Sequence, residues 1–249
     1  MAATSDLRMD LSVYPNPIRN INAAYESQSG LSIKFTEVAL VGDSPSSPGR
    51  LFFEGTQAII EHKIHISPQR LFETICHEMF HLELCLQGYP LLASLENDRD
   101  ARQLVAHVES LAQHPLVFEK EQALGYDPYT FESAVATEAY NVISTAPTFG
   151  PSNDHLWQFM YSLWATAYAR ARVLCKETST LNRLDALFKK TELTFAAGIA
   201  TQLSRVITKE ALSSANDYTQ TMRSIIDRII LGNQIANTHR IILNQPIFP

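Results

Sequence analysis

The chain has 249 residues and a formal net charge of −6, and its hydrophobic content of 45% and charged content of 18% are those of an ordinary globular protein. This length is enough for one large domain or two small ones. The acidic balance argues against non-specific nucleic-acid binding, which requires a basic surface. We therefore expect no nucleic-acid partner.

The sequence also bears on membrane insertion, secretion and disulfide formation. No stretch is apolar over the length that crosses a bilayer. The segment Met1–Asp6 lacks the basic and apolar regions of a secretion signal. The cysteines Cys76, Cys85 and Cys175 are too few for a disulfide framework. These features predict a cytoplasmic protein without a membrane partner, and the alternative is export without a cleavable signal peptide.

Strand character is confined to the N-terminal region. Leu31–Leu40 alternates partially between apolar and polar residues, and Gly42–Gly49 is rich in turn-forming residues. Two further short strands are predicted at Arg50–Glu54 and Ala58–Ile66. These segments predict a small antiparallel sheet.

A helix follows directly. Ser67-Pro68 is typical of an N-cap and a first helical position, and the chain from Pro68 to Gln87 contains no glycine and no further proline. Gly88 then stands where a helix-ending residue belongs, and Pro90 prevents continuation. Apolar residues recur along the segment at helical spacing, so much of this helix should be buried.

This helix carries the motif His77-Glu78-Met79-Phe80-His81. Residues four apart project from one face of a helix, so both imidazoles can reach one metal ion. Neutral imidazole suits Zn²⁺. Glu78 lies roughly 100° around the helix from His77, where it can flank the ion without ligating it and act on a bound water. Two ligands and a base within one helical turn form the H-E-x-x-H motif of zinc metallopeptidases.

At these residues the segment resembles the zincin superfamily of HExxH zinc metallopeptidases, over roughly residues 55 to 127. Uncharged residues flank and separate the histidines in that family, as they do here at Thr74, Ile75, Met79, Phe80 and Leu82. Glu83 departs from the pattern, because the family usually has an apolar residue there. The resemblance implies a strand before the metal helix that pairs with an extended substrate at the sheet edge, which would be Ala58–Ile66.

From residue 98 onward the pattern is helical, with glycine and proline as punctuation. The predicted helices are Arg99–Gln113, Pro115–Leu124, Pro128–Thr145, Asn153–Cys175, Leu181–Lys209 and Asn216–Leu231. The expected fold class is therefore α+β, with a small antiparallel N-terminal sheet packed on the HExxH helix and a predominantly helical region after it. We expect a single zincin-like domain over residues 1–249, with the sheet and metal helix at about 30–127 and the helical region at about 128–249.

A catalytic zinc needs three protein ligands and one open position. The candidates for the third ligand lie together in one predicted helix: His107, Glu109 and His114. The resemblance to the gluzincin branch of the zincins, which uses a glutamate on a following helix, makes Glu109 one choice.

Helix geometry favours His114. The apolar face is formed by Leu104, Val108 and Leu111, and Glu109 projects roughly 140° from Leu104 towards the polar side. His114 lies on the flank of the apolar face and precedes a proline, where we expect a bend that presents its imidazole to a pocket. We therefore predict His77, His81 and His114 as the metal ligands, with Glu109 as the alternative to His114.

These residues predict a zinc metallopeptidase that hydrolyses peptide bonds of a peptide or protein substrate, with zinc-bound water activated by Glu78. The alternative is a non-catalytic zinc-binding structural or interaction protein whose metal site is closed by four protein ligands, for which His107 and His114 would both ligate. A di-iron helical protein would need a second E-x-x-H motif, which this sequence lacks. A residue that stabilises the transition state could be Tyr89, Tyr126, Tyr140 or His155.

Overall fold

The computed structural model describes residues 6–7, 9–39, 41, 48–94, 99–146, 155–190, 193–227 and 241–244. The fold is mixed α+β and mostly helical, as the sequence predicts. The chain divides into two compact units, the first reaching to Leu91 and the second running from Leu92 to Asn244. The division falls shortly after the HExxH helix.

The first unit contains a sheet with the strand order β1-β2-β4-β3. Its strands are β1 (Asp6–Leu7), β2 (Lys34–Val38), β3 (Gly49–Glu54) and β4 (Gln57–Lys63). The prediction of a purely antiparallel sheet is wrong, because β2 and β4 run parallel while β1 and β2, and β3 and β4, run antiparallel. Strand β3 follows β2 in the chain but is not its neighbour in the sheet. Strand β4, which forms a hairpin with β3, lies between β2 and β3.

This order also corrects the expected edge strand. Ile60 of β4 pairs with Phe35 on one side and with Leu51 on the other, so β4 is an interior strand. The edge next to it is β3. A strand with neighbours on both sides has no free backbone groups for a substrate. The part of Ala58–Ile66 that forms β4 is therefore already paired on both sides and is not available for strand addition by a substrate.

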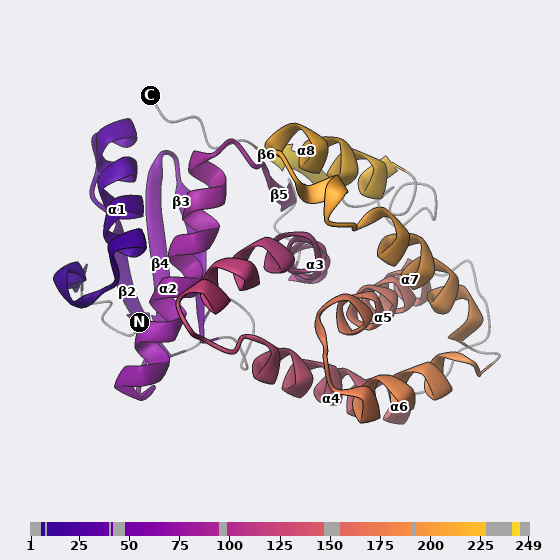
Figure 1. Cartoon of the computed structure of the whole chain (residues 1–249). Coiled ribbons are helices and arrows are strands. Elements are labelled where there is room, and N and C mark those ends of the chain that lie inside the picture. The colour runs from indigo at the N-terminus through magenta and orange to yellow at the C-terminus, as the bar shows by residue number, and fades with distance from the viewer. Residues whose placement is uncertain are drawn as a thin grey trace. The chain divides into compact units, whose positions relative to one another are not determined.

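Two helices, α1 (Asn16–Ser29) and α2 (Pro68–Leu86), contact each other, and α2 also contacts β3 and β4 (Figure 1). A short 3-10 helix, η1 (Leu11–Val13), precedes α1. Helix α1 was not expected, although Ile18, Ile21 and Tyr25 recur at helical spacing and are buried. Tyr25 ties α1 to the β3–β4 hairpin, because its hydroxyl donates to Thr56 O at 2.8 Å and accepts from Ala58 N at 2.7 Å.

The predicted caps of α2 are confirmed. Ser67 Oγ accepts a hydrogen bond of 3.2 Å from Arg70 N at the start of the helix. Gly88, just beyond the end, has a φ of 86°, which a residue with a side chain adopts only with strain. The face that packs inward includes Ile75, Met79 and Leu82, each with 0% exposure.

The second unit is helical, with α5 in contact with α3, α4, α6 and α7 (Figure 1). Its helices are α3 (Arg99–Ala123), α4 (Tyr129–Thr145), α5 (His155–Leu174), α6 (Thr178–Phe188), α7 (Thr194–Val206), the short η3 (Glu210–Leu212) and α8 (Ala215–Ser224). Two short strands, β5 (Leu91–Ser94) and β6 (Ile241–Asn244), pair with each other. No helix in the described part of the chain is both long and apolar enough to cross a lipid bilayer.

Two helix boundaries differ from the prediction. Helix α3 continues through Pro115, because Leu111, Ala112, Val117 and Phe118 are all buried around it. Burial of several such side chains outweighs the roughly 3 kcal/mol that an interior proline costs. The predicted helix Leu181–Lys209 is instead α6 and α7, which pack on different neighbours, α4 and α5. No proline or glycine marks that break, so the local sequence does not reveal it.

Candidate metal centre

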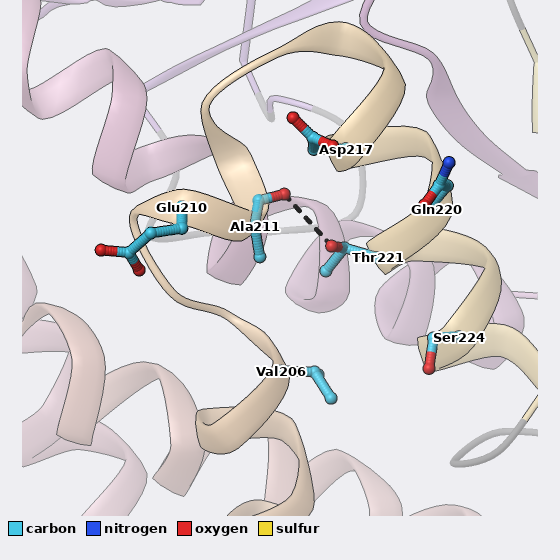
Figure 2. Close-up of a pocket in the computed structure, with 7 residues that line it drawn as sticks. All are labelled: Val206, Glu210, Ala211, Asp217, Gln220, Thr221 and Ser224. Atoms are coloured by element: carbon cyan, nitrogen blue, oxygen red, sulfur yellow. Dashed lines mark hydrogen bonds between the residues drawn. The ribbon is translucent and has the colours of Figure 1, made fainter.

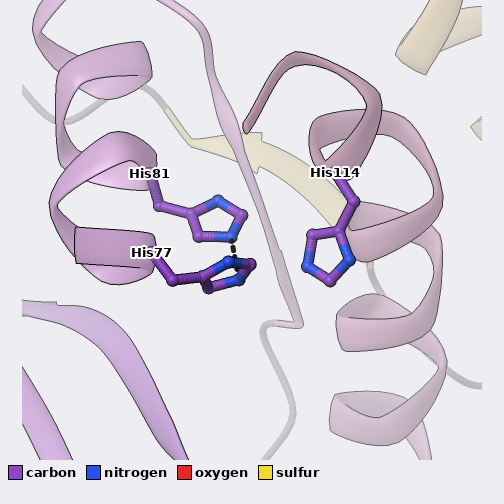
Figure 3. Close-up of side chains that lie close together, drawn as sticks. All are labelled: His77, His81 and His114. Carbon is purple, nitrogen blue, oxygen red and sulfur yellow. Dashed lines mark hydrogen bonds between the residues drawn. The ribbon is translucent and has the colours of Figure 1, made fainter. Parts of the chain in front are cut away.

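Two histidines of the HExxH motif point from one face of α2 (Figure 3). The Nε2 atoms of His77 and His81 lie 3.1 Å apart, and their rings meet at an angle of 72°. Two ligands of a tetrahedral zinc ion, with bonds of about 2.0–2.1 Å, would be about 3.3 Å apart. The spacing of the two imidazoles on α2 is thus suited to one ion.

His77, His81 and His114 of α3 form a set that we call the histidine group. One ligand atom from each of these residues lies within 4.8 Å of the others (Figure 3). His77 and His81 are half-buried, and His114 is buried. Three imidazoles leave one position of a tetrahedral ion for a water or a substrate. Among the described residues, this group includes neither a fourth ligand nor Glu109 or His107.

His114 is held within its own unit by residues of two neighbouring helices. Its Nδ1 atom lies 3.2 Å from Oε1 of Glu132, which belongs to α4. Arg170 of α5 donates to both oxygens of the same carboxylate, from Nη2 to Oε1 at 2.6 Å and from Nε to Oε2 at 2.8 Å. Burial alone would raise the pKa of Glu132, but the hydrogen bonds and positive charges of His114 and Arg170 lower it to about 2. Glu132 is therefore ionised at neutral pH.

The sequence reasoning missed Glu132 and Arg170. A signal for Arg170 does exist, since it ends a run without charged residues that covers most of α5, in which Tyr161, Trp164 and Tyr168 are buried. A cation at such a position usually requires a buried partner. The sequence offers no comparable signal that the partner is Glu132.

Glu78 lies on the sheet side of α2 and is only 6% exposed. A Cβ atom on Gly49 of β3 would lie 3.4 Å from Glu78 Oε1 and 2.4 Å from Thr74 Cγ2. Only a glycine at position 49 lets the strand approach the helix this closely. The carboxylate of Glu78 is thus packed beside the edge strand, and it is not a member of the histidine group.

Glu109, the alternative third ligand, forms a hydrogen bond with strand β5. The expectation that it projects towards the polar side of its helix is wrong, because its half-buried carboxylate accepts a hydrogen bond of 2.6 Å from Leu92 N in β5. Burial of this carboxylate raises its pKa to about 8, although the hydrogen bond from Leu92 acts in the opposite direction. His107 is also half-buried, and burial together with the charge of Arg170 lowers its pKa to about 4, against the attraction of Glu132.

The residues considered for transition-state stabilisation are dispersed. Tyr89 follows α2 and is buried, and Tyr126 follows α3 and is half-buried. Tyr140 lies beneath the guanidinium of Arg183, whose Cζ is 4.0 Å from the ring centroid. The side chain of His155 falls outside the described residues.

A separate pocket of about 350 Å³ lies between the end of α7 and α8 (Figure 2). Two of its polar side chains form hydrogen bonds within the chain. Asp217 accepts hydrogen bonds from Ser214 Oγ at 2.6 Å and from Ser213 Oγ at 3.2 Å, and Thr221 donates to Ala211 O at 3.1 Å. The pocket has no histidine or cysteine among its lining residues, which are Val206, Glu210, Ala211, Asp217, Gln220, Thr221 and Ser224. The histidine group is therefore the stronger candidate for chemistry.

Comparison of the chain with protein-family models, with curated proteins and with solved structures finds no match.

Proposed function

We propose that this protein is a zinc-dependent metallopeptidase in which His77, His81 and His114 hold the ion and Glu78 is the general base. The observation that carries the proposal is the spacing of 3.1 Å between the Nε2 atoms of His77 and His81 on a helix whose motif also supplies Glu78. The grouping of His114 with this pair supports a three-ligand site. Three nitrogen ligands and an open position are the usual set for catalytic zinc.

The donor set suits zinc better than the hard cations, because it consists of imidazole nitrogens and contains no carboxylate. His77, His81 and His114 would hold the ion, which when bound would supply Lewis acidity to lower the pKa of a water towards 7 and to polarise a peptide carbonyl. Glu78 then accepts the proton of the attacking water and passes it to the leaving amine. Glu78 is buried beside β3, and this burial would restrict the movement of its carboxylate between the two transfers.

The alternative is a closed zinc site with a structural role. That role requires a fourth protein ligand. Within the described residues, the histidine group offers three, and this favours the open, catalytic form.

The proposal is tested with the zinc-loaded protein and a mixed peptide library whose cleavage is followed by mass spectrometry. Wild-type protein should cleave peptide bonds, and Glu78→Gln should retain zinc but lose activity by several orders of magnitude, because an amide cannot accept the proton. Glu83→Gln, five residues further along the same helix, is the matched control and should remain active. Zinc binding without any cleavage would support the structural alternative instead, and cleavage that survives Glu78→Gln would contradict the assigned base.

A further inference from the structure

A buried ion pair between Glu132 and Arg170 lies next to His114. The side chains of His114, Glu132 and Arg170 are 8%, 1% and 10% exposed, and they come from three different helices of one unit. Burying two charges costs several kcal/mol, and a well-packed apolar pair is often at least as stable. Stability alone is therefore a weak reason for this arrangement.

Two polar contacts of His114 Nδ1 bear on which ring nitrogen carries the proton. Arg170 can only donate, and its planar guanidinium holds both oxygens of Glu132, so the direction of the carboxylate is restricted. The ionised carboxylate can only accept. His114 Nδ1 lies 3.2 Å from Glu132 Oε1 and 3.4 Å from Arg170 Nη2. We assign the proton to Nδ1 from the shorter contact, because an unprotonated Nδ1 would place its lone pair against a lone pair of the carboxylate.

A neutral imidazole with its proton on Nδ1 has its lone pair on Nε2. A carboxylate that accepts from the non-ligating nitrogen both selects this tautomer and makes the histidine a better metal ligand. We propose that Glu132 and Arg170 are positioning residues of the metal centre: Glu132 sets the tautomer and ring orientation of His114, and Arg170 holds Glu132. This inference rests on the proposed function.

The first measurement needs no metal. Long-range ¹⁵N–¹H correlation spectra of the metal-free protein at pH 8 distinguish the two imidazole tautomers, and His114→Gln assigns the signal. We expect the proton of His114 on Nδ1 and none on Nε2. In the double variant Glu132→Gln/Arg170→Gln, this preference should weaken. A proton on Nε2 of His114 in the wild-type protein would overturn the inference.

The second measurement is zinc affinity, determined by competition with a chromogenic chelator. Glu132→Gln/Arg170→Gln removes both buried charges together, so that no unpaired charge is left in the core. Its zinc affinity should fall by about 10–100-fold, the usual effect of removing a partner of a metal ligand. Glu138→Gln/Arg172→Gln, which changes exposed residues on the same two helices, is the matched control and should bind zinc as wild type does.

Cobalt absorption spectra add a geometric readout, since the visible bands of Co²⁺ report its coordination. These bands should shift in the Glu132→Gln/Arg170→Gln variant and remain in the control. If the double variant fails to fold, Arg170→Lys replaces it, because lysine keeps the positive charge but cannot make the bidentate contact with Glu132. Arg170→Lys should weaken zinc binding, whereas Arg172→Lys should not.

The outcomes separate the two proposals. Wild-type protein that takes up no zinc, or whose uptake survives His77→Ala, contradicts the metal centre itself. Wild-type protein that binds zinc through His77, while the double variant matches its control in affinity and cobalt spectrum, overturns only the role of Glu132 and Arg170.

Discussion

The carboxyl group of Glu109 accepts a hydrogen bond of 2.6 Å from the backbone N–H of Leu92, and this bond connects α3 to strand β5. Glu109 occupies a different environment from Glu132, although both are acidic residues of the helical unit. Burial raises the pKa of Glu109 to about 8, whereas His114 and Arg170 overcome the effect of burial and lower the pKa of Glu132 to about 2. The two carboxyl groups therefore differ in charge at neutral pH.

The raised pKa of Glu109 predicts a pH dependence of stability. Between its ordinary value of 4.5 and about 8, the folded protein keeps a proton that the unfolded chain releases. Its contribution to the free energy of unfolding is thus fully present below pH 4.5 and falls as the pH rises to 8, by at most about 1.4 kcal/mol per pH unit. Glu109→Gln keeps an acceptor for Leu92 N and should flatten this slope in urea unfolding experiments from pH 5 to 8. A variant with the wild-type slope would show that Glu109 is not the group responsible.

Zinc affinity should distinguish the candidates for the third ligand. His114→Ala should weaken zinc binding more strongly than Glu109→Ala, because His114 belongs to the histidine group and Glu109 is bound to Leu92. His107→Gln, on the same helix, should leave the affinity close to that of wild type. Loss of zinc on replacing Glu109 but not His114 would indicate a gluzincin-like site and contradict our assignment.

Zinc should also stabilise the fold. The purified protein should hold about one zinc per chain, since one ligand atom from each of the three imidazoles lies within 4.8 Å of the others, a spacing that suits a single ion. At a free zinc concentration of 100 times Kd, the free energy of unfolding should rise by about 2.7 kcal/mol, and a chelator should reverse the gain in Tm. His77→Ala and His81→Ala should each remove the zinc-dependent increase while leaving the metal-free Tm comparatively unaffected. Stoichiometric iron, or full zinc retention in both variants, would refute the predicted site.

The close approach of β3 to α2 predicts the effect of two glycine substitutions. Gly49→Ala would place its Cβ 2.4 Å from Thr74 Cγ2 and should destabilise the protein by about 1–3 kcal/mol. Thr74→Ser removes that methyl group and should recover part of the loss in a double-mutant cycle.

Gly198 in α7 is the matched control, because a Cβ there meets nothing within 4 Å. Gly198→Ala should stabilise the protein by about 0.4–1 kcal/mol. Equal effects at the two positions would show that the contact with Thr74 is not what requires Gly49.

Local periodicity accounts for the features that the sequence predicted well. Ser67, Pro68 and Gly88 mark the ends of α2 because caps act over three or four residues. The same period places His77 and His81 on one face. Pro115 is a local signal that conflicts with packing, and packing prevails. Helix α3 runs through Pro115 because the buried side chains around it offset the missing hydrogen bond.

The sequence by itself determined the motif helix and the pairing of its two imidazoles, because both depend on residues close together in the chain. Only the tertiary structure decided that β4 lies inside the sheet, that Glu109 is bound to Leu92, and that Glu132 and Arg170 meet behind His114. Arg170 is separated from Glu132 by 38 residues and from His114 by 56. Such contacts follow from the packing free energy of a whole unit, to which no local pattern in the chain corresponds.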